Sequence, residues 1–240
     1  MKIPKPPARV FAFNAHDRDA WVARNAALIA PGSRVLDVGA GAAQYRPLFA
    51  HCEYKTQDSG RLTVAQAGWA GAGYGDIDYV SDISAIPVPD GSFDAVLCTE
   101  VLEHVPEPID AMREISRILR PRGRLLLTAP QRSGKHQAPQ HYYGGFTPEW
   151  YRTILPRYGL TVDSIEPNGG FFRAYGEETQ RFVFMILPRG WRQKAPWLWP
   201  AWAVLKAWAL TVVLASHGLD RFDSDRGFTV GHHVVATKTG

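Results

Sequence analysis

One short run, VLDVGAGAAQY over residues 35–45, constrains the fold more than any other part of the sequence. It opens as an apolar strand, which ends at Val38 and passes directly into the turn Gly39, Ala40 and Gly41. Glycine lacks a Cβ and adopts positive φ at little cost, so this turn allows the backbone to approach a ligand closely. A glycine-rich turn after a strand is typical of α/β proteins that bind nucleotides.

An acidic residue inside this run, Asp37, indicates the charge of the ligand. A turn shaped only for pyrophosphate would gain from backbone N–H groups and a helix dipole, and a carboxylate would oppose that binding. Asp37 therefore favours a nucleoside that carries positive charge. S-adenosylmethionine (SAM), which has a sulfonium and an ammonium group, fits this requirement.

Strand and helix patterns alternate along the chain, which predicts a largely parallel sheet with helices on both faces. After the first strand we expect strands at 53–58, 78–87, 93–100, 124–130, 160–167 and 228–238, and helices at 17–30, 107–120 and 147–159. The length suits one domain, 1–240. Residues 1–30 are expected to form an N-terminal arm and helix that act as a lid, with prolines keeping 1–15 extended.

Two further acids lie at predicted strand ends, Asp58 in the second strand and Asp82 in the third. Asp58 can accept hydrogen bonds from both ribose hydroxyls, and Asp82 can accept one from an adenine amine. By itself Asp58 would also suit NAD, because a dinucleotide fingerprint places an acid about twenty residues after its glycines. Asp82 and Asp37 together make an NAD-dependent dehydrogenase the weaker alternative.

These motifs resemble those of class I SAM-dependent methyltransferases. The resemblance rests on VLDVGAG, Asp58 and SDISAIPVPDGSFDAVLCTEVLEHVPEPIDAMREISRILRPRGRLLLTAP, and it covers about 33–166 and 228–238. It is strongest to the branch of ubiquinone and menaquinone biosynthesis C-methyltransferases and small-molecule O- and N-methyltransferases. The resemblance implies a Rossmann-like, doubly wound, seven-stranded sheet, mostly parallel with one antiparallel strand and helices on both faces.

The resemblance also implies where SAM, and its product S-adenosylhomocysteine, would bind. Asp37 would interact with the ammonium group of SAM, directly or through water, and the glycine turn would pass under the methionine moiety of SAM. The family's third glycine is Ala43 in this chain, which is expected to be a mild change in packing. The residues expected to contact SAM are Asp37, Gly39, Ala40, Gly41, Asp58, Ser59, Asp82, Ile83, Cys98 and Thr99.

Methyl transfer from a sulfonium mainly requires alignment of acceptor and methyl group. A base is needed when the acceptor must lose a proton. The candidates are Glu103 and His104 after the fourth strand, and His141 and Tyr142 in the loop after the fifth. Helix capping and loop packing are the structural alternatives for these residues. The eight histidines show no metal-ligand spacing, so no metal site is predicted.

Residues 167–227 form an insertion between the last two predicted strands, where a short connection would suffice. It contains five of the eight tryptophans, and its core, 197–216, is apolar apart from Lys206. That length would just span a bilayer. Three interpretations stay open: a lid or homodimer helix, a peripheral membrane contact through 190–218, and a true membrane span.

We therefore predict a SAM-dependent methyltransferase acting on a small, apolar, aromatic or lipid-like acceptor. The alternatives are other chemistry on SAM and a non-catalytic SAM-binding protein. The net charge of only +4, with scattered basic residues, does not indicate a nucleic-acid partner. Two cysteines and the absence of a visible secretory signal favour the cytoplasm, with membrane association as an addition.

Overall fold

The computed structural model describes residues 8–61, 75–186 and 196–240. These residues form two compact units. The larger unit comprises Arg18–Glu166 and Gly231–Gly240, and the smaller comprises Met1–Asp17 and Pro167–Val230. Each unit is described by itself below.

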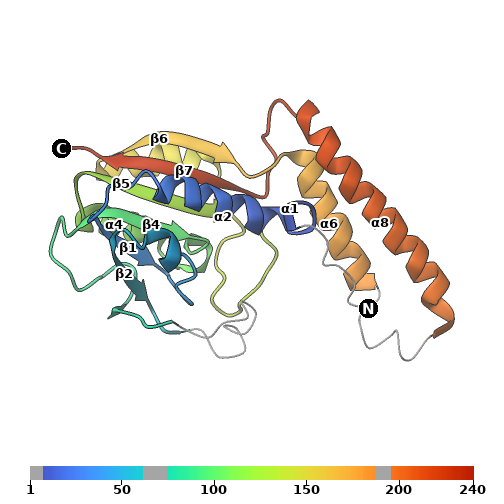
Figure 1. Ribbon diagram of the computed structural model, residues 1–240, viewed down its shortest axis with the longest axis horizontal. Coiled ribbons are helices and arrows are strands. Elements are labelled where there is room, and N and C mark those ends of the chain that lie inside the picture. The colour runs from blue at the N-terminus through green and yellow to red at the C-terminus, as the bar shows by residue number, and fades with distance from the viewer. Residues whose placement is uncertain (1–7, 62–74, 187–195) are drawn as a thin grey trace. The chain divides into compact units, whose positions relative to one another are not determined.

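The larger unit is built on a seven-stranded sheet in the order β3-β2-β1-β4-β5-β7-β6 (Figure 1). Strands β1 to β5 pair in parallel, and β7 pairs antiparallel with β5. The predicted fold class is therefore confirmed. The strands are β1 Arg34–Val38, β2 Glu53–Asp58, β3 Tyr79–Val80, β4 Phe93–Thr99, β5 Leu119–Pro130, β6 Leu160–Pro167 and β7 Gly231–Lys238.

The strand order places a topological switch point between β1 and β4. From β1 the chain moves outward to β2 and β3, then returns to add β4 on the other side of β1. Val38 at the end of β1 pairs with Gln57 in β2 and with Cys98 in β4. The carboxyl ends of these strands therefore meet at one edge of the sheet, where open α/β sheets bind their ligands.

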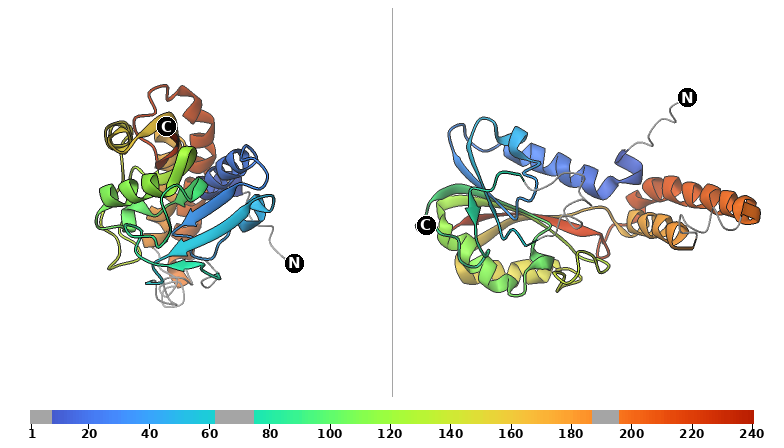
Figure 2. Two further views of the ribbon diagram at one scale, coloured as in Figure 1. Left: turned by 90° about the vertical axis from the view of Figure 1, so that its left-hand side faces the viewer. Right: turned by 90° about the horizontal axis from the view of Figure 1, so that it is seen from below.

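Helices cover both faces of the sheet. Figure 2 shows α4 on one face and the blue helix α2 on the other. Pro108 opens α4, where its missing N–H costs nothing, and Met112, Ile115 and Ile118 are fully buried along one side of that helix. The helices are α1 Ala8–Phe11, α2 Phe13–Ala26, α4 Pro108–Ile118, α5 Pro148–Ile154, α6 Phe171–Ile186 and α8 Trp199–Leu219, with short 3-10 helices η1 Arg46–Phe49, η3 Leu102–His104, η4 Leu155–Tyr158, η5 Pro196–Leu198 and η6 Asp220–Phe222.

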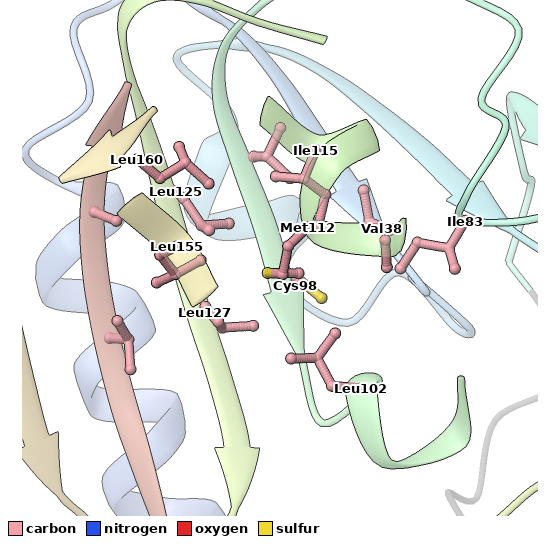
Figure 3. Packing of buried hydrophobic residues seen from close by; sticks show 14 of the residues in the cluster. Val38, Ile83, Cys98, Leu102, Met112, Ile115, Leu125, Leu127, Leu155 and Leu160 are labelled. Carbon is pink, nitrogen blue, oxygen red and sulfur yellow. The ribbon is translucent and has the colours of Figure 1, made fainter. Parts of the chain in front are cut away.

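Alternation along the strands divides the core into two clusters. Leu36 and Cys98 belong to the cluster that packs under α4 (Figure 3), whereas Val35 and Leu97 belong to the cluster on the opposite face, together with Trp21. Successive side chains of a strand point to opposite faces, which explains why neighbours in sequence join different clusters.

Two local predictions were wrong. The third strand has only two residues, Tyr79–Val80, so Asp82 lies beyond it. The Asp82 carboxylate accepts hydrogen bonds from the Ser84 backbone N–H at 3.0 Å and hydroxyl at 2.9 Å, and this Asx-type turn ends the strand. The arm predicted over 1–15 is helical from Ala8 because the prolines stop at position 7, while residues 1–7 lie outside the described structure.

Helices α6 and α8 run antiparallel in the smaller unit and account for most of the predicted insertion. A Cβ on Gly176 of α6 would lie 3.2 Å from Ser216 of α8, and the rings of Phe182 and Trp208 lie 6.3 Å apart between their centroids. The small residue at 176 therefore allows a close approach at one end of the pair, and aromatic rings fill the other end.

Candidate cofactor and active site

The glycine turn follows β1 with two left-handed residues, Gly39 at φ +69° and Gly41 at φ +51°. A Cβ on Gly39 would lie 2.4 Å from Cγ2 of Val101, whereas a Cβ on Gly41 would meet no atom within 4 Å. Gly39 is therefore required by its φ angle and by close packing, and Gly41 by φ alone. Ala43 also has positive φ, at 51°, which is uncommon for a residue with a side chain.

Asp58 joins the end of β2 to this turn. Its Oδ2 accepts a hydrogen bond from the Gly41 backbone N–H at 3.1 Å, and its Oδ1 accepts one from the Gly60 N–H at 2.9 Å. The side chain is buried but still contributes to the wall of a cleft at the carboxyl ends of the strands. A carboxylate oxygen accepts more than one hydrogen bond, so Asp58 retains capacity for ligand hydroxyls.

The cleft brings together many of the predicted site residues from separate elements. Those that line it are Gly39, Asp58, Ser59, Asp82, Ile83, His104 and Tyr142. Six further residues of the wall were not predicted: Gln57, Arg61, Val105, Pro106, Gln137 and Gln140. Most of them lie within a few positions of a predicted residue, which is the signal that could have identified them.

Asp82 is exposed at the wall of this cleft. Hydrogen bonds from the Ser84 backbone, then from its hydroxyl, hold the pKa of the Asp82 carboxyl below its usual range, with help from Arg61. An Arg61 nitrogen lies 3.5 Å from Oδ2 of Asp82. The ionised carboxylate is suited to accept a hydrogen bond from an amine, as predicted for adenine.

Asp37 is buried below the turn, with 2% of its surface exposed. The Tyr54 hydroxyl donates a hydrogen bond to its Oδ2. Burial raises the pKa of Asp37 to about 7, and the hydrogen bond from Tyr54 opposes that rise. Asp37 is not among the residues that line the cleft, so its approach to a ligand ammonium stays a prediction.

Cys98 and Thr99 end β4, between the turn and the candidate catalytic residues. The Cys98 side chain is fully buried beside Met112 and Leu127 in the core (Figure 3), and burial raises the pKa of its thiol. Any contact of Cys98 with SAM would therefore involve its backbone. Thr99 is half-buried and is not part of the cleft wall.

The four predicted catalytic residues gather where η3 meets the loop after β5. The Tyr142 backbone N–H donates to the Glu103 carbonyl at 2.8 Å, which ties the two segments together. Glu103 is buried, and its burial and the nearby Glu100 raise the pKa of its carboxyl well above the usual range. Burial lowers the pKa of His104 to about 4, so its imidazole is neutral near pH 7.

A third histidine, His136, completes this group. Its ring centroid lies 4.7 Å from that of His104 and 4.5 Å from that of His141. Tyr142 is exposed at the mouth of the cleft. The site thus places imidazoles and a phenol beside the cleft at the carboxyl ends of the strands, and side chains of these types can accept or donate the proton of an acceptor.

The strand order and the glycine turn define the class I SAM-dependent methyltransferase fold. Residues 36–127 match the family described as a methyltransferase domain, so this part of the chain is similar to methyltransferases of that class. The ubiquinone biosynthesis O-methyltransferase of Xanthomonas oryzae pv. oryzae (strain PXO99A) is 37% identical over 109 residues, which are 42% of this chain and 45% of that protein. The match therefore spans less than half of that relative.

Solved structures share the fold at low sequence identity. Phosphoethanolamine N-methyltransferase 2 of Haemonchus contortus, solved with SAM, has a TM-score of 0.54 at 16% identity over 93% of this chain and 53% of that one. The 4+2 cyclase SpnF has a TM-score of 0.57 at 23% identity over 98% of this chain and 85% of that one. Proteins of different activity therefore share this fold, and the reaction must be argued from the site.

SAM is the cofactor of this domain class, and the residues of the site fit it. Gly39 and Gly41 have positive φ and no Cβ atom, so no side chain opposes a close approach of a ligand to the backbone there. Asp58 at the end of β2 and Asp82 just after β3 place two carboxylates at the wall of one cleft, and a carboxylate can accept hydrogen bonds from ribose hydroxyls or an adenine amine. When bound, SAM supplies a methyl group activated by its sulfonium.

Proposed function

We propose that the protein transfers the methyl group of SAM to a small acceptor with apolar or aromatic character. The observation that carries this proposal is the cleft itself, in which Asp58, Asp82 and Ile83 adjoin His104 and Tyr142. The nucleoside would lie along the three former residues, and the acceptor would face the two latter. Alignment in this cleft supplies most of the catalysis.

Neutral His104 is the residue best placed to take a proton from the acceptor. Its Nδ1 lies in hydrogen-bonding contact with the Gln140 carbonyl, which leaves Nε2 as the basic nitrogen. Glu103 lies beside this nitrogen, with Oε1 3.7 Å from Nε2. A hydroxyl acceptor is favoured because its proton must leave during transfer, and the relative from Xanthomonas is named as an O-methyltransferase.

The proposal is tested with SAM that carries a labelled methyl group. Hydroxylated aromatic compounds with apolar tails are expected to become labelled, whereas polar amino acids of similar size are not. The same reactions with Asp58→Ala protein control for transfer outside the site. Tight SAM binding without labelling of any acceptor would favour the alternative, a SAM-binding protein of other chemistry.

The smaller unit supports a lipid-like acceptor and a membrane contact. Residues 179–219 include Arg181, Arg189, Arg192, Lys194 and Lys206 but no acid. The helix Trp199–Phe222 is long and apolar enough to cross a membrane by length and composition alone, and only 17% of its most apolar 18-residue stretch is buried. Cationic and aromatic residues beside an apolar helix favour the surface of an anionic membrane.

We propose that the α6–α8 pair binds the membrane surface peripherally, with the rest of the protein in the cytoplasm. Phe184 and Met185 at the end of α6 are 62% and 73% exposed, and Trp197 in η5 and Trp199 at the start of α8 are 73% and 60% exposed. Because α6 and α8 are antiparallel, these side chains gather at one end of the pair. A homodimer through the same residues is the alternative.

Vesicle flotation tests this contact. The full chain is expected to float with vesicles that contain anionic lipid and to remain behind with purely zwitterionic ones. The double variant Trp197→Ser, Trp199→Ser should lose most of this binding. Leu28→Ser, which changes an exposed apolar residue of the other unit, should not. Self-association without flotation would support the homodimer instead.

A further inference from the structure

Three potential metal ligands meet at the wall of the cleft, although they come from separate segments. Glu103 and His104 lie on η3, and His136 lies in the loop after β5. One ligand atom from each of the three side chains lies within 4.8 Å of the others. Two imidazoles and a carboxylate are a common donor set for transition-metal cations.

The two imidazoles face each other with bare nitrogen atoms. Nδ1 of His104 contacts the Gln140 carbonyl, and Nδ1 of His136 lies 2.9 Å from the Gly134 carbonyl. A carbonyl oxygen only accepts hydrogen bonds, so these two contacts favour a proton on each Nδ1 and a lone pair on each Nε2, although the Ser133 hydroxyl also lies 3.2 Å from Nδ1 of His136. The two Nε2 atoms nevertheless lie 3.1 Å apart. This contact is repulsive unless a positive charge lies between or beside them.

Glu103 supplies the second, independent observation. Its side chain is 2% exposed, and Oε2 has no hydrogen-bond partner. Oε1 lies 3.7 Å from Nε2 of His104. An unpartnered buried carboxylate oxygen is costly, and a bound cation would remove that cost.

We propose that Glu103, His104 and His136 bind a divalent transition-metal ion of the zinc type. Zn–N bonds of about 2.0–2.1 Å in a tetrahedral site place two nitrogens about 3.3 Å apart, close to the distance between the two Nε2 atoms. The carbonyls that accept from each Nδ1 orient the rings, as the outer partners of metal-bound histidines do. Three protein ligands leave a position open toward the cleft that His104 lines. Nε2 of His104 cannot take an acceptor proton while it holds the metal, so the proposed proton transfer to His104 belongs to the metal-free protein.

The site is tested with the metal alone. Chelator-treated full-length protein is titrated calorimetrically with Zn²⁺, and with Co²⁺ as a spectroscopic probe of tetrahedral geometry. We expect one Zn²⁺ per chain, little binding of Mg²⁺, and at least a tenfold weaker affinity in both His136→Ala and Glu103→Gln. His51→Ala, which removes a histidine bonded to the Ile29 carbonyl elsewhere, should leave the affinity unchanged.

Failure to bind one Zn²⁺ per chain, or equal affinity in wild type and both variants, would overturn the site. Circular dichroism of each variant confirms that it folds, and His136→Ala changes only a half-buried loop side chain. The titration contains neither SAM nor acceptor. A negative result therefore leaves the proposed methyl transfer standing, and a failure of methyl transfer leaves the metal site standing.

Discussion

Replacement of Asp58 by alanine is expected to weaken SAM binding by at least about 100-fold. The carboxylate is predicted to accept hydrogen bonds from two ribose hydroxyls, and a hydrogen bond to a charged group contributes about 1.5–3 kcal/mol. Two such bonds contribute about 3 kcal/mol or more, and a loss of about 3 kcal/mol weakens binding about 100-fold. The variant also loses the bonds to the Gly41 and Gly60 N–H groups, so the glycine turn loses an anchor.

Calorimetric titration with SAM and S-adenosylhomocysteine measures this effect. Asp94→Ala is the matched control, because Asp94 also accepts a hydrogen bond from a backbone N–H, that of Arg34, at the start of its strand. It lies at the opposite edge of the sheet and should leave the affinity unchanged. Equal SAM affinity in the Asp58 variant and wild type would remove Asp58 from the binding site, and binding of NAD instead would refute the SAM site.

Asp37→Asn is expected to stabilise the ligand-free protein above pH 7 while weakening SAM binding. The pKa of Asp37 is about 7 in the folded protein against an ordinary 3.8. This difference, at about 1.4 kcal/mol per pH unit, corresponds to about 4 kcal/mol. Because the folded-state pKa is raised, the neutral Asp37 carboxyl stabilises the folded protein fully below about pH 4, and this stabilisation is lost as the pH rises through about 7. Asparagine resembles the neutral acid at every pH.

Thermal unfolding between pH 4 and 8 measures this difference. The gap in stability between Asp37→Asn and wild type should open as the pH rises from 4 to 7 and then stay constant. Tyr54→Phe keeps the ring that stacks on Phe49 but removes the donor to Asp37, so it should retain the pH dependence. Parallel profiles for wild type and Asp37→Asn would show that the carboxyl is not buried as described.

Features encoded by neighbouring residues could be predicted from the sequence. The strand at 160–167 was predicted with its observed bounds, because apolar and polar residues are interspersed there after Gly159 and up to Pro167. Thr147 was correctly predicted to cap α5, and its side chain accepts from the Trp150 N–H. β5, however, starts at Leu119 instead of 124, because pairing of Phe93 with Leu119 extends the strand beyond its apolar core.

Contacts between distant residues could not be predicted in this way. The hydroxyl that bonds Asp37 comes from Tyr54 on the neighbouring strand, 17 residues away. His104 and His136 are 32 residues apart and meet only because the loop after β5 folds back onto η3. A search by spacing along the chain cannot detect such a pair.

The position of β7 has a consequence for the order in which the protein can assemble. β7 lies between β5 and β6, although it follows both of them in the chain. Until residues 231–238 emerge from the ribosome, β5 has no neighbour on that side and β6 has none between it and the sheet. The nascent chain therefore exposes the unpaired edge of β5, a surface prone to aggregation, until these residues have been made.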